Sequence, residues 1–313
     1  MISHQKQQVE YTLTFQSKEK KLDNIAVKEK KIAAALSILS NTTLIILKFI
    51  AGTLSGRIGI ISEAIHSGSD LLASIITFFS VSESAKPADN DHQFGHGKYE
   101  DFTSFIEGAL IILAAFYIIY EALKKIIFSL EIEVDANVGM AVMLFSVFAN
   151  IFVSAYLFKV AKKTGSTALY ADGEHLRTDI YSSLAVLIGL ILVKITGNHI
   201  FDPLIAIAVA VIIFIAGYKI CDEARKSLLD TSLSENENSQ IREIVAKHTG
   251  SDVIKLKNLR TRKAGLKKNI EIILIVEKTM QIATGHCICD KIEDEIEARL
   301  QNTDTTIHLE PNA

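Results

Sequence analysis

The chain of 313 residues has few cysteines and lacks the short motifs of several large protein classes. Its only cysteines, Cys221, Cys287 and Cys289, argue against a disulfide framework. No G-x-x-x-x-G-K-[ST] sequence occurs, which argues against ATP-driven pumping and against a nucleotide partner. The first 30 residues are polar and lack the apolar core and cleavage site of a signal peptide.

Long apolar runs are abundant, and 49% of the residues are hydrophobic. A helix needs about 20 apolar residues to cross the roughly 30 Å hydrocarbon layer of a bilayer. Six such runs lie near residues 32–52, 58–82, 101–123, 138–160, 168–194 and 202–221. We therefore expect an N-terminal tail (1–30), an all-α transmembrane domain of six helices (31–222) and a polar C-terminal domain (223–313).

Basic residues set the expected orientation. They cluster before the first run (Lys28, Lys30, Lys31), after the fourth (Lys159, Lys162, Lys163) and around the end of the sixth (Lys219, Arg225, Lys226). Because such residues mark cytoplasmic ends, both termini are expected inside, with Lys124 and Lys125 as a minor contrary signal. The compact size favours the plasma membrane of a prokaryote.

The polar C-terminal region alternates between helical and strand patterns. Helices are predicted over 236–248 and 283–300, and strands over 253–261, 269–277 and 305–309, with Gly265 in the first turn. The order αββαβ predicts an α+β domain of ferredoxin-like type, with a small open sheet and helices on one face.

A polar pattern occurs twice inside the apolar runs. The first copy is Glu63-x-x-His66-x-x-x-Asp70, and 109 positions later the second is Asp172-x-x-His175-x-x-x-Asp179. Spacings of three and four place each set on one helix face. Asn41 and Asn150 are also 109 positions apart, which favours an inverted repeat of three helices, although coincidence among apolar helices is the alternative.

Charged groups at membrane depth cost about 2.5–3.5 kcal/mol each on insertion scales and therefore suggest function. Two facing His–Asp pairs, His66, Asp70, His175 and Asp179, offer four ligands for one divalent metal. The alternative is a polar network that joins helices. Glu63 and Asp172 are assigned supporting roles, in which they orient the histidines or line the ion's route. The alternative is that they pack between helices. Lys48 and Glu107 are interpreted as isolated charges that pack against helices or extend toward water.

The segment between the second and third runs contains Asp89, His92 and His96 within eight residues. Histidine and carboxylate ligands suit zinc, cobalt and ferrous iron. The alternative is a turn whose histidines are solvated or cap a helix.

The motifs together resemble one family. P-A-D-x-x-H-x-F-G-H-G-K-x-E after the second run, H-S-x-x-D within it and A-D-x-x-H-x-x-x-D in the fifth are similar to those of the cation diffusion facilitators. Leu228-Leu229-Asp230 and Leu259-Arg-Thr-Arg also match, so the resemblance extends from about residue 30 to the end.

The resemblance implies a homodimeric membrane antiporter that moves zinc or a related divalent cation out of the cytoplasm against protons. The cation is the substrate, and no organic cofactor or nucleic acid is implied. The transport site would be His66, Asp70, His175 and Asp179, and a loop site would be Asp89, His92 and His96. Lys98 would pair with Asp230 near the dimer interface, or the two would form an ordinary surface contact.

The C-terminal domain departs from relatives that carry a binuclear zinc site. Lys257 and Ile273 stand where those relatives have histidines. A reduced site of His286, His308 and Glu310, with Cys287 or Cys289, is one interpretation. Surface histidines and free thiols are the other.

Two further function classes compete with transport. One is a membrane metal sensor or scaffold that binds without transporting. The other is an intramembrane metal-dependent hydrolase, although there is no H-E-x-x-H motif and four protein ligands would close the metal's coordination shell. Among metals, the absence of cysteine from the site argues against cuprous copper. The resemblance favours zinc over cobalt, cadmium and ferrous iron.

Overall fold

The computed structural model of the protein describes residues 2–55, 58–128, 137–198, 200–250 and 253–312. For some helical residues, among them Glu63 and His66, it describes the backbone alone. The chain forms two compact units, Met1–Asp222 and Glu223–Ala313.

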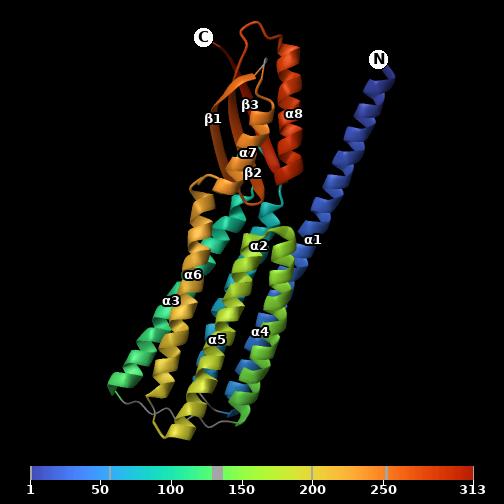
Figure 1. The fold of residues 1–313 in the computed structure, drawn as a ribbon. Helices are drawn as coiled ribbons and strands as arrows, with labels where there is room; N and C mark the ends of the chain where they lie inside the picture. Colours follow the sequence, from blue (N-terminus) through green and yellow to red (C-terminus); the bar gives the residue numbers. More distant parts are fainter. Residues whose placement is uncertain (1, 56–57, 129–136, 199, 251–252, 313) are drawn as a thin grey trace. The chain divides into compact units, whose positions relative to one another are not determined.

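The first unit is helical (Figure 1). Its helices are α1 (Ile2–Ser55), α2 (Ile58–Ser84), α3 (Lys98–Phe128), α4 (Asn137–Thr164), α5 (Thr167–Thr196) and α6 (Phe201–Leu228), the last of which continues into the second unit. Four segments among the described residues are long and apolar enough to cross a membrane: Asn24–Ile50, Lys98–Ile127, Leu144–Thr164 and Phe201–Leu228. They lie in α1, α3, α4 and α6, whereas α2 and α5 carry the repeated polar residues.

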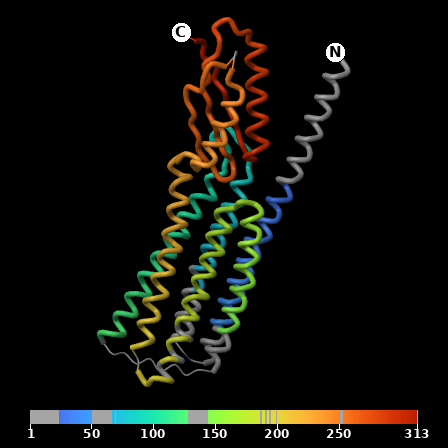
Figure 2. Tube along the Cα trace, viewed as in Figure 1, coloured from blue at the N-terminus to red at the C-terminus, as the bar shows by residue number. Residues whose placement is uncertain are grey.

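Small residues bring the helices together. Helix α1 packs on α2 and α4, and α5 packs on α3 and α4. Figure 2 shows α4 and α5 running side by side. Ala33, Ala161 and Ala168 are buried beside Leu157 and Leu176 in one cluster. Small side chains allow close helix packing in membranes, where no water drives apolar surfaces together. The interior also holds polar groups, which the functional site uses.

The second unit is an α+β domain, as predicted. Its elements are α7 (Glu235–Lys247), β1 (Val253–Ala264), β2 (Lys267–Val276), α8 (Ile282–Leu300) and β3 (Thr303–Pro311). The sheet has the order β1-β2-β3, with β1 antiparallel and β3 parallel to β2. The turn between β1 and β2 contains Gly265 at φ +60°, a conformation that favours glycine.

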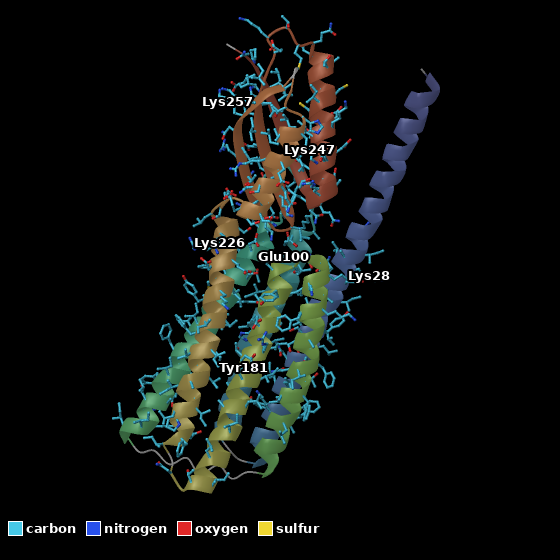
Figure 3. All side chains as sticks on the ribbon, viewed as in Figure 1. Lys28, Glu100, Tyr181, Lys226, Lys247 and Lys257 are labelled. Atoms are coloured by element: carbon cyan, nitrogen blue, oxygen red, sulfur yellow. The ribbon has the colours of Figure 1, made fainter. Side chains whose placement is uncertain are left out.

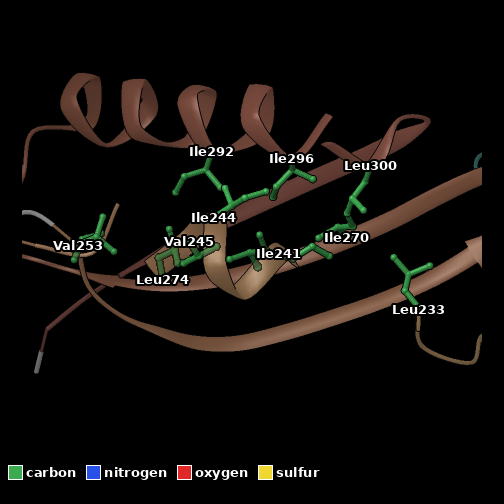
Figure 4. Close-up of a cluster of buried hydrophobic side chains, with 12 residues drawn as sticks. Leu233, Ile241, Ile244, Val245, Val253, Ile270, Leu274, Ile292, Ile296 and Leu300 are labelled. Atoms are coloured by element: carbon green, nitrogen blue, oxygen red, sulfur yellow. The ribbon is translucent and has the colours of Figure 1, made fainter. Parts of the chain in front are cut away.

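One face of this sheet forms the core with both helices (Figure 4). Alternate residues of β2, such as Ile270, Ile272 and Leu274, are buried against Ile244 of α7 and Ile292 of α8. The capping box at the start of α7, in which Ser234 accepts from the backbone of Glu237 and Glu237 accepts from that of Ser234, fixes where the helix begins.

Candidate functional site

The repeated motif brings α2 and α5 together at one point. Ligand atoms of Asp70, His175 and Asp179 all lie within 4.8 Å of one another. His175 Nε2 is 3.1 Å from Asp70 Oδ1, and both residues are buried. Three residues that the sequence predicts as ligands are therefore gathered in a space that suits a metal ion. The side chains of His66 and Glu63, the other predicted members, lie outside the described residues.

The surroundings hold this cluster in place. Asn41 of α1 donates to Ser74 Oγ at 2.8 Å and to the backbone carbonyl of Asp70 at 3.4 Å. It therefore joins helices, as amide side chains often do in membranes. Lys48 is also buried and donates to Ser67 of α2 at 2.7 Å, so of the two roles predicted for it, it packs against another helix and does not extend toward water.

A pocket reaches the cluster from one side. It encloses about 510 Å³, its open mouth included, and is lined by residues of α1, α2, α4 and α5, among them Ser67, Asp70, Asn150 and Asp179. The lining residues of α2 end at Asp70, and those of α5 begin at Asp179. The pocket therefore lies on the side of the cluster toward the start of α2.

On the other side of the cluster, further polar side chains are buried between the helices. Asp172 is fully buried and accepts from Ser74 Oγ at 3.2 Å. Glu107 of α3, also buried, accepts from Thr77 of α2. Glu107 has no charged residue or histidine three or four positions away in its own helix, so the sequence shows no signal that separates it from an isolated charge.

A second carboxylate network lies where α2 ends and α3 begins. Glu100, labelled in Figure 3, accepts from Lys30 of α1 at 2.7 Å and from Ser84 of α2 at 2.7 Å. Its second oxygen accepts from Ser166, just before α5. Glu100 is 4% exposed, so these bonds are shielded from water. One side chain thus holds four segments together at this end of the helices.

The predicted loop ligands Asp89, His92 and His96 also lie together. Their ligand atoms are within 4.8 Å of one another, and His96 Nε2 is 3.4 Å from Asp89 Oδ2. Hydrogen bonds from the backbone of His92 and Asp91 lower the pKa of Asp89. His96 Nδ1 lies 3.2 Å from the carbonyl of Pro87. Because a carbonyl only accepts, Nδ1 carries the proton and Nε2 is left as the ligand atom.

The residues predicted for a C-terminal metal site are not brought together in the described part of the chain. His308 and Glu310 lie in register with Ile273 and Ile275, on the sheet face away from the helices, because alternate strand residues point to opposite faces. Glu310 pairs with Lys257 at 2.6 Å, and His286 of α8 pairs with Asp290 at 3.2 Å. Cys287 is exposed and Cys289 buried. Among the described residues of one chain, no cluster joins His286 with His308 and Glu310, so this site stays a prediction.

The predicted pair of Lys98 and Asp230 has one residue in each unit and stays a prediction. Within the second unit, Asp230 lies 3.4 Å from Arg262. Its backbone has φ 54°, in the left-handed region.

Comparisons with known proteins agree over most of the chain. Residues 34–229 match the cation efflux transmembrane domain, and residues 233–312 match the cation efflux protein cytoplasmic domain. An uncharacterized transporter of Synechocystis sp. is 33% identical over 278 residues, which are 89% of each chain. The cation-efflux pump FieF of Yersinia pestis is 31% identical over 280 residues, 89% of this chain and 92% of that protein.

A solved structure of CzrB, a candidate zinc transporter, is 26% identical, with a TM-score of 0.25. It covers 26% of this chain and 99% of that structure. The family matches rest on both units and on near-complete coverage of the relatives. The chain belongs to the cation efflux family of transporters.

Proposed function

We propose that the protein exports a divalent metal cation, zinc before cobalt, cadmium or ferrous iron, from the cytoplasm in exchange for protons. The observation that carries the proposal is the cluster of Asp70, His175 and Asp179 between α2 and α5. His66 is the proposed fourth ligand, because it lies four residues before Asp70 on the same helix. Two nitrogen and two oxygen ligands suit a tetrahedral borderline cation.

Competition between metal and protons would couple the two fluxes. Histidine and carboxylate must lose their protons before they bind a metal, so metal binding releases protons and protonation releases metal. All six helices α1–α6 are proposed to span the membrane, with both termini in the cytoplasm. The pocket then reaches the site from the outer side, and a rearrangement of the helices would expose the site to the inner side.

Other parts of the chain have roles under the same proposal. The cluster of Asp89, His92 and His96 would hold a cation at the cytoplasmic end of α2. Two copies would form a homodimer in a prokaryotic plasma membrane, with Lys98 and Asp230 as an ion pair near the interface.

Alanine at either buried carboxylate tests the proposed site. Asp70→Ala and Asp179→Ala should each reduce zinc-driven proton flux in proteoliposomes to background, because each removes one ligand and one negative charge. Glu121→Gln, which alters a partly exposed pair with Lys124 on α3, is the control and should transport normally. Zinc-driven proton flux at the unmodified level in both alanine variants would refute the site. Zinc binding without flux in the unmodified protein would favour a sensor or scaffold.

The proposed nitrogen ligand His66 should influence which metal is carried. His66→Asp replaces nitrogen with oxygen and should shift transport from zinc toward harder ions such as Mn²⁺. Flux of zinc, cobalt, cadmium and manganese, compared pairwise in the same vesicles, measures the shift. An unchanged order of preference would argue that His66 is not a ligand.

A further inference from the structure

Helix α2 carries a row of polar side chains beyond Asp70, on the side away from the pocket. Ser74, Thr77 and Ser80 follow Asp70 at intervals of four, three and three residues, so they share one helix face. Ser74 and Thr77 are fully buried, and Ser80 is 5% exposed. The row faces the interior of the helical bundle and ends one turn before Ser84, which bonds to Glu100.

Polar atoms without partners concentrate along this row. Within the described residues, six buried side-chain atoms have no hydrogen-bond partner, and four of them are Ser80 Oγ, Glu107 Oε2, Asp172 Oδ2 and His175 Nδ1. A buried polar atom left unbonded is destabilising, so native proteins rarely leave several close together. The presence of four such atoms in one region suggests that a further group binds there and forms bonds with them.

Glu107 and Asp172 are the charged members of this group. Each uses one carboxylate oxygen to accept from a hydroxyl of α2, Thr77 for Glu107 and Ser74 for Asp172. The other oxygen of each is unbonded, and the side chains are 1% and 0% exposed. Because Ser74 and Thr77 are three residues apart on one face of α2, the two carboxylates that bond to them belong to the same buried region of the helical bundle. Two buried carboxylates cannot both stay charged unless a cation compensates them, and without a cation at least one of them holds a proton.

We propose that Glu107 and Asp172, with the hydroxyl of Thr77, form a second divalent-cation site whose ligands are all oxygen. Carboxylate and hydroxyl oxygens favour hard cations such as Mn²⁺ and Mg²⁺, in contrast to the histidine-containing cluster at His175. The role of this site rests on the proposed transport function: it would hold a cation between the Glu100 end of the helices and the Asp70–His175–Asp179 cluster. Binding itself does not depend on transport.

Equilibrium binding of Mn²⁺ to the purified full chain in detergent tests the site, with electron paramagnetic resonance counting the free ion. His175→Ala serves as the background, because it weakens the histidine-containing cluster. Adding Glu107→Gln should lower the bound Mn²⁺ by one ion per chain, and so should adding Asp172→Asn. Excess Mg²⁺ should displace this same ion. Ions held by Asp89, His92 and His96 are common to all variants and cancel in the difference.

Glutamine and asparagine keep the shape of the side chains and remove a buried charge, so the variants should remain folded, as thermal unfolding will report. Glu121→Gln in the same background is the matched control and should retain the ion. Equal Mn²⁺ counts with and without Glu107→Gln and Asp172→Asn would overturn the proposal. Absence of zinc flux in the unmodified protein would instead overturn the transport function and leave these counts unaffected.

Discussion

Two cysteines on α8 differ in chemistry although only one residue separates them. Cys287 is exposed, whereas Cys289 is 8% exposed and faces the core. Burial raises the pKa of the Cys289 thiol, and the nearby carboxylates of Glu293 and Asp290 raise it further. Because the thiolate is the reactive form, Cys289 is protected both by access and by protonation.

Alkylation should therefore distinguish the two thiols. At neutral pH, iodoacetamide should modify Cys287 about tenfold faster than Cys289 or more, measured by mass spectrometry of the folded protein. Since a raised pKa delays formation of the thiolate, the rate at Cys289 should still be rising with pH where free glutathione has levelled off. Equal rates at both positions would contradict the burial of Cys289.

Single residues also show how far sequence reasoning reaches. Asp70, His175 and Asp179 were predictable because their spacing repeats in two helices. Asp172 was singled out for the same reason, but its bond to Ser74 depends on how α5 meets α2. Glu107 could not be recognised at all, since only the packed structure places Thr77 of another helix beside it.

At the scale of elements, α3 and α6 meet at two glycines. A Cβ added at Gly217 would lie 2.9 Å from the backbone carbonyl of Gly108. One added at Gly108 would lie 3.1 Å from the carbonyl of Gly217 and the same distance from the backbone nitrogen of Cys221. Backbone atoms cannot move aside as side chains do, so this approach requires glycine at both positions.

Gly217→Ala should therefore force α3 and α6 apart and destabilise the protein by about 1–3 kcal/mol. Thermal unfolding in detergent measures the loss. Gly68→Ala on α2 is the control, because a Cβ there meets no atom within 4 Å, and its stability should stay equal or rise slightly. A Gly217→Ala variant as stable as Gly68→Ala would show that the two helices do not pack this closely.

The type and order of the elements were largely predictable, and their partners were not. Hydrophobic periodicity gave the order αββαβ, and the predicted helix over 236–248 differs by one residue at each end from α7 (Glu235–Lys247). The same patterns did not show that Lys257 would reach across β2 to Glu310, because that contact depends on sheet order. Because alternate residues of a strand point to opposite faces of a sheet, the sequence of β3 could have shown that His308 lies on the face away from the helices.

At the scale of the whole molecule, the proposed orientation makes the second unit cytoplasmic. The exposed thiol of Cys287 lies in that unit, so its labelling shows on which side of the membrane the unit lies. A membrane-impermeant maleimide should leave Cys287 unlabelled in intact cells and label it in inverted membrane vesicles. A permeant maleimide should label it in both, which controls for reactivity. Labelling by the impermeant reagent in intact cells would reverse the proposed topology.

Glu100 has a consequence for how the first unit can open. Its carboxylate holds Lys30, Ser84 and Ser166, which belong to or border three different helices. Each of these three segments must give up a buried hydrogen bond to move away from Glu100. Freeing that one side chain releases all three contacts at once. Under the proposed transport function, opening at this end is therefore expected to break the three bonds to Glu100 together rather than one after another.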